Sequence, residues 1–166
     1  MGDTQGKRVD SVSRLIQASP REIYQAYMDP EKLVSWLAPE GMKGRIEVFE
    51  PREGGSFRMI LTYQQPGGSA PGKSSQDSDV VNGRFVELVP DRRIVQEFEF
   101  ESEDPAFAGT MTMTWQLKPV REGTEVEVSA EDVPTGIGQE DHEAGIGSTL
   151  ANLAAFVEDR ERPEQR

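Results

Sequence analysis

Apolar residues alternate with polar residues through the middle of this chain and change to a helical spacing near its end. In the clearest strand-like segment every second residue is apolar: Met111, Met113, Trp115 and Leu117. Later, four apolar residues lie four, three and four positions apart, as on one face of a helix: Ile146, Leu150, Leu153 and Val157. Apolar faces of these two kinds are stable when each covers the other. The pattern predicts a sheet that packs against one long helix.

Turn residues divide the chain into seven predicted strands and three predicted helices. The strands cover Val9–Gln17, Arg45–Glu50, Ser56–Tyr63, Val80–Val89, Arg93–Glu101, Thr110–Pro119 and Thr124–Ala130. Ser19 and Pro20 open a first short helix that ends near Asp29. A second short helix covers Glu31–Leu37, and the long helix covers Gln139–Arg160. The short turns between neighbouring strands are typical of an antiparallel meander.

We therefore expect an α+β fold, in which a curved antiparallel sheet of six to seven strands wraps around a long C-terminal helix. Two short helices follow the first strand. A single domain is expected over residues 9–160, with flexible ends at residues 1–8 and 161–166. Residues 64–79 are rich in glycine, serine and proline, which favours a long flexible hairpin loop in a position to cover one end of the space under the helix.

Composition excludes several classes of protein. The chain has 166 residues, no cysteine and a net charge of −12. Without cysteine it has neither disulfides nor thiolate metal sites, and its acidic surface repels nucleic acid. No apolar run is long enough for membrane insertion, and residues 1–10 lack the apolar centre of a secretory signal. These features predict a cytoplasmic protein with no cofactor and no bound metal.

A further pattern is carried by several segments in a fixed order: Ser19–Glu31 with Trp36 and Pro39, Arg52–Arg58, Gly83–Pro90, Gly123–Val126 and Gly145–Leu153. In order and spacing they resemble the heat-shock-ATPase-activator-like (Aha-type) branch of the SRPBCC superfamily. The resemblance implies a helix-grip fold, shared with START lipid-transfer domains and polyketide aromatase/cyclases, with an apolar cavity between the sheet and the last helix. It also suggests a homodimer. Family members often carry tryptophan after the glycine at position 145, whereas this chain has Ile146, which either widens the cavity mouth or is repacked.

An apolar stripe is the candidate lining of that cavity. Its members are Trp36, Phe57, Met59, Tyr63, Phe85, Phe98, Met111, Met113, Trp115, Ile146 and Leu150. Methionine adapts to irregular shapes, so the stripe suits an apolar ligand that is lipid-like or aromatic. The alternative is an ordinary core, because a domain of this size needs most of its apolar residues for packing.

Glu87 is a candidate catalytic residue. Strict alternation from Phe85 places Glu87 on the same face, where a buried carboxylate has a raised pKa and can act as a general acid or base. The alternative is a carboxylate at the end of a strand, paired with Arg58 or Arg93.

His142 and Tyr63 are weaker catalytic candidates. His142 is the single histidine, and its acidic neighbours favour the charged form of a proton shuttle. Its simpler interpretation is an exposed polar residue in the acidic first turn of the last helix. A metal site built with Glu140 and Glu143 is disfavoured, because one histidine and solvated carboxylates seldom form a closed site.

Three functions remain open, in a ranked order. The first is the binding of an apolar small molecule between the sheet and the last helix. The second is an aromatase/cyclase-like or hydrolase-like enzyme that uses Glu87, Tyr63 or His142. The third is a chaperone-associated interaction module that acts through its surface, as the eukaryotic namesakes of the family do.

Overall fold

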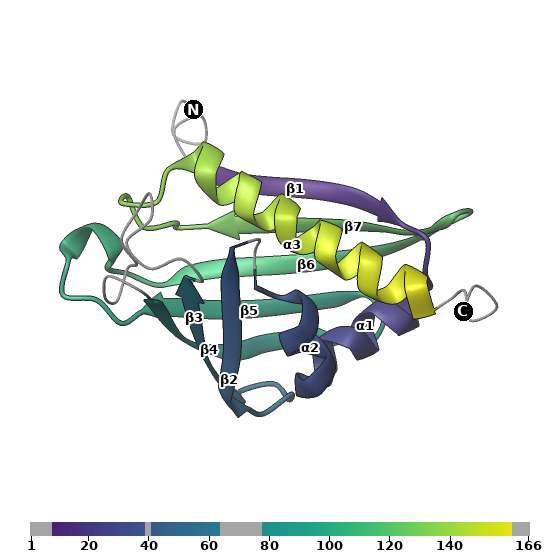
Figure 1. The fold of residues 1–166 in the computed structure, drawn as a ribbon, viewed down its shortest axis with the longest axis horizontal. Helices are drawn as coiled ribbons and strands as arrows, with labels where there is room; N and C mark the ends of the chain where they lie inside the picture. The colour runs from purple at the N-terminus through teal and green to yellow at the C-terminus, as the bar shows by residue number, and fades with distance from the viewer. Residues whose placement is uncertain (1–7, 39–40, 64–77, 161–166) are drawn as a thin grey trace.

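The computed structural model describes residues 8–38, 41–63 and 78–160. Within these residues, seven antiparallel strands form one sheet in the order β1-β7-β6-β5-β4-β3-β2 (Figure 1). The strands are β1 (Val9–Ile16), β2 (Met42–Phe49), β3 (Ser56–Tyr63), β4 (Ser78–Val89), β5 (Arg93–Phe100), β6 (Met111–Val120) and β7 (Gly123–Glu131). The helices are α1 (Pro20–Met28), α2 (Pro30–Trp36), the short 3-10 helix η2 (Pro105–Phe107) and α3 (Gln139–Arg160).

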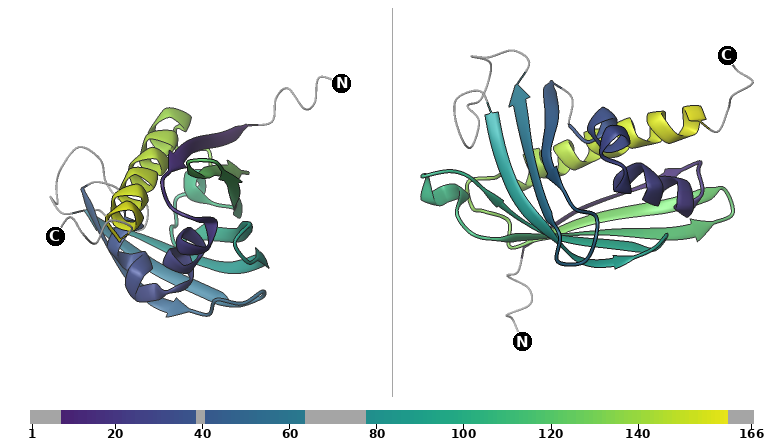
Figure 2. Two further views of the ribbon diagram at one scale, coloured as in Figure 1. Left: turned by 90° about the vertical axis from the view of Figure 1, so that its right-hand side faces the viewer. Right: turned by 90° about the horizontal axis from the view of Figure 1, so that it is seen from below.

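The sheet curves around α3, which crosses its concave face diagonally (Figures 1 and 2). Strands β2 to β7 follow one another as a meander, and β1 pairs with β7, so the first and last strands are neighbours. Figure 2 shows β2, β3 and the beginning of β4 bending toward the side of the sheet on which α3 lies. The expected α+β helix-grip architecture is confirmed.

Two strands begin earlier than their side chains indicate. β2 begins at Met42 rather than Arg45, and β4 begins at Ser78 rather than Val80. In both cases the neighbouring strand continues the backbone pairing, because Met42 is opposite Tyr63 and Ser78 is opposite Thr62. Backbone pairing does not require an alternating pattern, so these residues carry no sequence signal. The predicted loop at 64–79 is therefore too long at its end, and residues 64–77 lie outside the described residues.

The two short helices begin at side-chain caps. The Oγ of Ser19 accepts a hydrogen bond from the Glu22 amide at 3.1 Å, as the sequence predicts. The Oδ1 of Asp29 accepts one from the Glu31 amide at 2.9 Å, so Asp29 both ends α1 and starts α2. Such caps satisfy amide groups that have no partner in the first turn of a helix. They fix the corner between α1 and α2.

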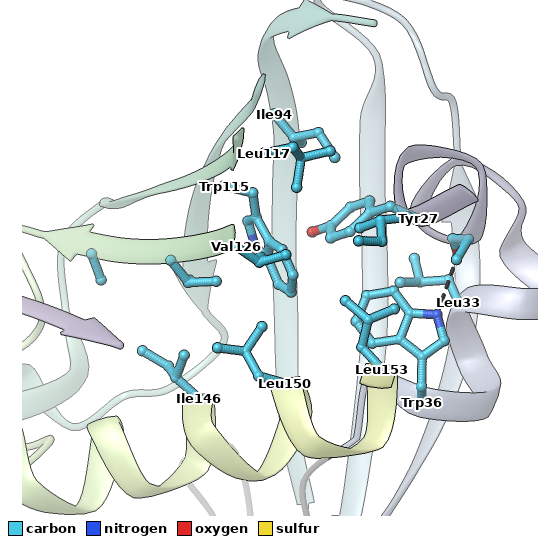
Figure 3. Close-up of a cluster of buried hydrophobic side chains, with 14 of the residues drawn as sticks. Tyr27, Leu33, Trp36, Ile94, Trp115, Leu117, Val126, Ile146, Leu150 and Leu153 are labelled. Carbon is cyan, nitrogen blue, oxygen red and sulfur yellow. Dashed lines mark hydrogen bonds between the residues drawn. The ribbon is translucent and has the colours of Figure 1, made fainter. Parts of the chain in front are cut away.

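The interior contains two aromatic groups. Tyr27, Trp36 and Trp115 form a triangle of edge-on contacts, with ring centroids 5.2–5.8 Å apart. A second group consists of Phe49, Phe57, Phe85 and Phe98. From α3, apolar side chains point toward the sheet (Figure 3): Ile146, Leu150 and Leu153. The interior of the domain is thus bounded by the sheet on one side and by α1, α2 and α3 on the other.

Candidate functional site

Most of the side chains predicted to line a cavity lie buried between the sheet and α3. Those less than 8% exposed are Trp36, Phe57, Met59, Phe85, Phe98, Met111, Trp115, Ile146 and Leu150. Met113 is partly buried. The structure describes the backbone of Tyr63 but not its side chain, so its predicted role stays a prediction.

One part of the inner face is less completely covered than the rest. Four of its apolar side chains are only partly buried, and we call them the inner patch: Ile46, Leu61, Phe100 and Met113. Ile46 is opposite the buried Met59, and Phe100 is opposite the buried Val81, so both share the inner face with core residues.

Gly145 of α3 borders open space. It is itself partly buried, yet a Cβ atom added to it would meet no heavy atom within 4 Å. One turn later, the Oγ1 of Thr149 donates a hydrogen bond to the Leu37 carbonyl at 2.9 Å. The face of α3 that carries Thr149 is therefore turned toward the end of α2. Because residues four apart lie on one face of a helix, Gly145 points in the same direction. Ile146 is buried at 7% exposure, so it packs into the interior instead of leaving its position empty.

A buried polar pair lies in the middle of the inner face. The Tyr27 hydroxyl of α1 donates a hydrogen bond to the Oε1 of Gln96, which has no exposed surface. Burial raises the pKa of Tyr27, so its hydroxyl stays protonated and remains a donor. The Nε2 of Gln96 has no hydrogen-bond partner among the described residues.

Sequence reasoning missed this pair, although a signal was present. In β5 the inward residues alternate as Ile94, Gln96 and Phe98, so an amide occupies a core position. Buried amides nearly always have their hydrogen bonds satisfied, so an unsatisfied one calls for an explanation. Gln96 is opposite Phe85 on β4 and opposite Met113 on β6. It therefore lies where the aromatic core meets the inner patch.

The structure corrects the expected orientation of Glu87. A β-bulge shifts the register between Phe85 and Glu87, so alternation does not continue from one to the other. After the bulge it is Leu88 that is opposite the buried Ile94. The side chain of Glu87 is 44% exposed and lies 3.7 Å from the Arg93 guanidinium, the partner that the alternative interpretation named. Glu87 does not face the interior.

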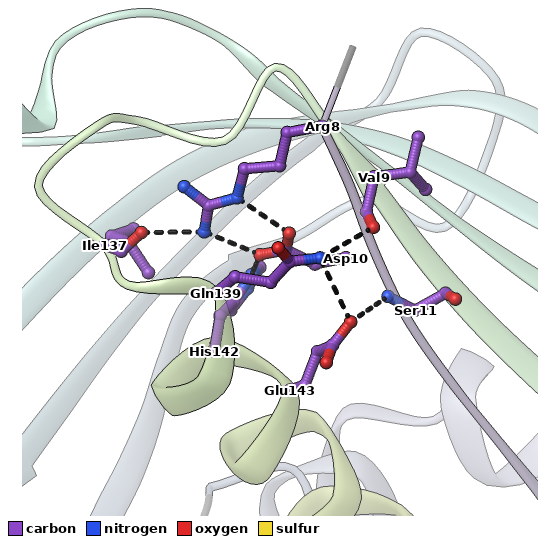
Figure 4. A network of polar contacts seen from close by, with 8 residues as sticks. All are labelled: Arg8, Val9, Asp10, Ser11, Ile137, Gln139, His142 and Glu143. Atoms are coloured by element: carbon purple, nitrogen blue, oxygen red, sulfur yellow. Dashed lines mark hydrogen bonds and ion pairs between the residues drawn. The ribbon is translucent and has the colours of Figure 1, made fainter. Parts of the chain in front are cut away.

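His142 belongs to a polar network that joins β1 to the start of α3 (Figure 4). Its Nδ1 lies 2.7 Å from Oδ2 of Asp10, a carboxylate with no exposed surface. Arg8 donates two hydrogen bonds of 2.8 Å to Asp10 and one of 2.7 Å to the Ile137 carbonyl. His142 is therefore not the exposed residue that the simpler interpretation expected, and Arg8 is bound although it was assigned to a flexible end.

The same network protects the free edge of the sheet at β1. The Glu143 carboxylate accepts a hydrogen bond from the Ser11 amide at 3.0 Å, and Gln139 donates one to the Val9 carbonyl at 3.1 Å. At the other end of β1, Glu158 accepts from the Gln17 amide at 2.9 Å. Unpaired edge groups invite pairing with other chains, so these contacts keep β1 attached to its own helix.

A separate depression of about 530 Å³ lies on the outer face of the sheet. Its polar lining includes Ser13, Arg93, Gln116 and Glu127. Gln116 and Glu127 are exposed and alternate with the buried residues of β6 and β7, so they face away from α3. This depression is distinct from the predicted apolar site.

Within residues 8–38, 41–63 and 78–160, no group of three or more histidine, cysteine, aspartate or glutamate side chains is arranged to hold a metal ion. In the same part of the chain, no helix combines the length and apolarity needed to cross a bilayer.

Comparisons with known proteins agree with this geometry. Residues 17–158 match the family described as Activator of Hsp90 ATPase homolog 1-like protein. A crystal structure of a protein from Chromobacterium violaceum is 30% identical, has a TM-score of 0.79 and covers 90% of this chain and 96% of its own. No curated protein matches the chain significantly.

Two more distant structures show the same fold. One, from Rhodobacter sphaeroides, is 22% identical with a TM-score of 0.72, and covers 91% of this chain and 92% of its own. The other is an AHSA1-like protein from Aeromonas hydrophila, 17% identical with a TM-score of 0.68, which covers 93% of this chain and 94% of its own. The chain belongs to the Activator of Hsp90 ATPase homolog 1-like family, as its resemblance to the Aha-type branch of the SRPBCC superfamily implied.

Proposed function

We propose that this protein binds a predominantly apolar small molecule between the inner face of its sheet and α3. The observation that carries the proposal is the inner patch: Ile46, Leu61, Phe100 and Met113 face inward and are apolar, yet remain partly exposed. A ligand that covered them would gain about 25 cal/mol for each Å² of apolar surface removed from water.

Two further observations support this location. A Cβ atom added at Gly145, on the face of α3 that Thr149 turns toward Leu37, would meet no heavy atom within 4 Å. Glycine inside a helix destabilises it by about 0.5–1 kcal/mol relative to alanine, so its presence there fits a requirement for room. The fold of this family also commonly holds hydrophobic ligands.

The test is native mass spectrometry of the purified protein, followed by denaturation and analysis of any released small molecule. We expect one apolar adduct per chain. The variant Gly145→Leu should reduce the adduct, because its side chain enters the open space. Ala151→Leu is the matched control, since it adds a similar side chain at an exposed position of the same helix. Equal loading of both variants would place the ligand elsewhere.

The other functions stay predictions without a specific observation in their favour. An enzyme that used a carboxylate in the interior would need one other than Glu87, which faces outward. A homodimer and a chaperone partner remain expectations from the family resemblance alone. The cytoplasmic location likewise stays a prediction.

A further inference from the structure

Gln96 is an unusual residue for the centre of an apolar interior. It has no exposed surface, and its inward neighbours along β5 are Ile94 and Phe98. Its Oε1 accepts the hydrogen bond from Tyr27, while its Nε2 has no partner among the described residues. Rotating the amide by 180° would leave Oε1 without a partner instead, and would also leave the Tyr27 hydroxyl proton without an acceptor. An unsatisfied amide of this kind destabilises the protein, so it needs a compensating role.

Its position relates it to the ligand site. Gln96 is opposite Met113, a member of the inner patch, and Met113 is partly buried although it faces inward. On its other side it is opposite Phe85, which is fully buried. A ligand lying on the inner patch would therefore meet Gln96 at the inner end of the site.

We propose that the Nε2 of Gln96 is the hydrogen-bond donor that recognises a neutral carbonyl oxygen on the apolar ligand, and that Tyr27 holds the amide in place. This inference rests on the proposed function and specifies the chemistry of its ligand. With Oε1 toward Tyr27 the hydroxyl proton has an acceptor, which a rotated amide would not provide, so the N–H group of Gln96 is the one left for the ligand.

The same surroundings disfavour a charged ligand group. Gln96 and Tyr27 are both uncharged, and the chain as a whole carries a net charge of −12. A carboxylate buried beside them would have no cation to pair with among the side chains named for this interior. A ketone, ester or amide carbonyl needs one donor, which is what Gln96 offers.

The experiment compares two probes of similar shape, propionylnaphthalene and sec-butylnaphthalene, in which a ketone oxygen replaces a methyl group. We expect the wild-type protein to prefer the ketone, and Gln96→Leu to reduce that preference about tenfold, the effect of losing one hydrogen bond. The hydrocarbon should bind both proteins equally. The infrared carbonyl band of the bound ketone should lie at lower frequency in the wild type than in Gln96→Leu.

Two controls separate this role from a structural one. Ile94→Val trims a neighbouring inward residue of β5 without touching the amide, and should leave the preference for the ketone unchanged. If Gln96→Leu fails to fold, Tyr27→Phe/Gln96→Leu removes both polar partners together and should also lose the preference.

Each outcome has a definite meaning. A preference for the ketone that survives in Gln96→Leu, or an unchanged carbonyl band, would overturn the role of Gln96 and leave the proposed function intact. Equal binding of the two probes by the wild type would do the same. Binding of neither probe by the wild type would contradict the proposed function and this inference together.

Discussion

His142 Nδ1 lies 2.7 Å from Oδ2 of Asp10, and this contact joins two residues that are 132 positions apart in the chain. Asp10 has no exposed surface, and it also accepts two hydrogen bonds from Arg8. The contact fastens the first strand to the first turn of α3. It gives the single histidine of the chain a structural role at the opposite end of the helix from α1 (Figures 1 and 4).

Asp10→Asn is expected to lower the free energy of unfolding by about 1–3 kcal/mol, because it replaces charge-assisted hydrogen bonds with weaker ones. Urea denaturation at neutral pH measures the change. Glu140→Ala, at an exposed position of the same helix turn, is the control and should have little effect.

The contribution of Asp10 should also depend on pH. Burial by itself raises the pKa of Asp10, but hydrogen bonds from Arg8 and His142 outweigh burial and leave the pKa below its ordinary value of 3.8. As pH falls, the unfolded chain therefore takes up this proton first. The stabilisation is complete above the unfolded value and is lost as pH falls through 3.8 toward the lower folded pKa. The gap in stability between wild type and Asp10→Asn should narrow over that range, and a constant gap would contradict this account.

The edge of β1 gives a third prediction. Glu158→Ala removes the acceptor of the Gln17 amide, so hydrogen exchange at Gln17 should become several-fold faster. The Ser11 amide bonds to Glu143 and serves as an internal control that should not change. Faster exchange along the whole of β1 would mean that the strand detaches as a unit.

The two glycines of α3 should tolerate a larger residue. A Cβ added at Gly145 or Gly147 meets no heavy atom within 4 Å, so Gly145→Ala and Gly147→Ala should each stabilise the protein by about 0.5–1 kcal/mol. Gly83 is the contrasting case, because its added Cβ would lie 2.6 Å from both the Glu97 carbonyl and the Phe98 ring. Gly83→Ala should destabilise the protein. Thermal unfolding of the three variants and the wild type measures these changes.

The buried pair should show strong coupling. Tyr27→Phe leaves the Oε1 of Gln96 without its donor and should cost about 1–3 kcal/mol of stability. In Tyr27→Phe/Gln96→Leu no polar atom of the pair remains, so part of that loss should be recovered. A double-mutant cycle measures the coupling, and strictly additive effects would show that the two side chains do not act as a pair.

The fold could be predicted from sequence because its signals are local. Alternation in β6, the helical spacing in α3 and the Ser19 cap each point to one kind of element. The cap and the long helix are confirmed at the predicted residues. Together with the order of segments shared with the family, they were sufficient for the architecture.

The candidate site was less predictable because it depends on register and on contacts between distant residues. A single bulge after Phe85 turns Glu87 outward, and no residue pattern predicts that bulge. The contact between Asp10 and His142 forms only because α3, at the end of the chain, lies beside β1, the first strand. Gln96 did carry a signal, as an amide in an inward position of β5, but its partner Tyr27 comes from α1.

The location of the ligand can be measured directly by methyl NMR during titration with sec-butylnaphthalene. Binding between the sheet and α3 should shift the methyl signals of Ile46, Leu61 and Met113 of the inner patch, with little change at Val86, which is 42% exposed. Saturation at one molecule per chain should accompany these shifts. Shifts centred on Val89, which lines the outer depression, would contradict binding between the sheet and α3, as would the absence of any shift.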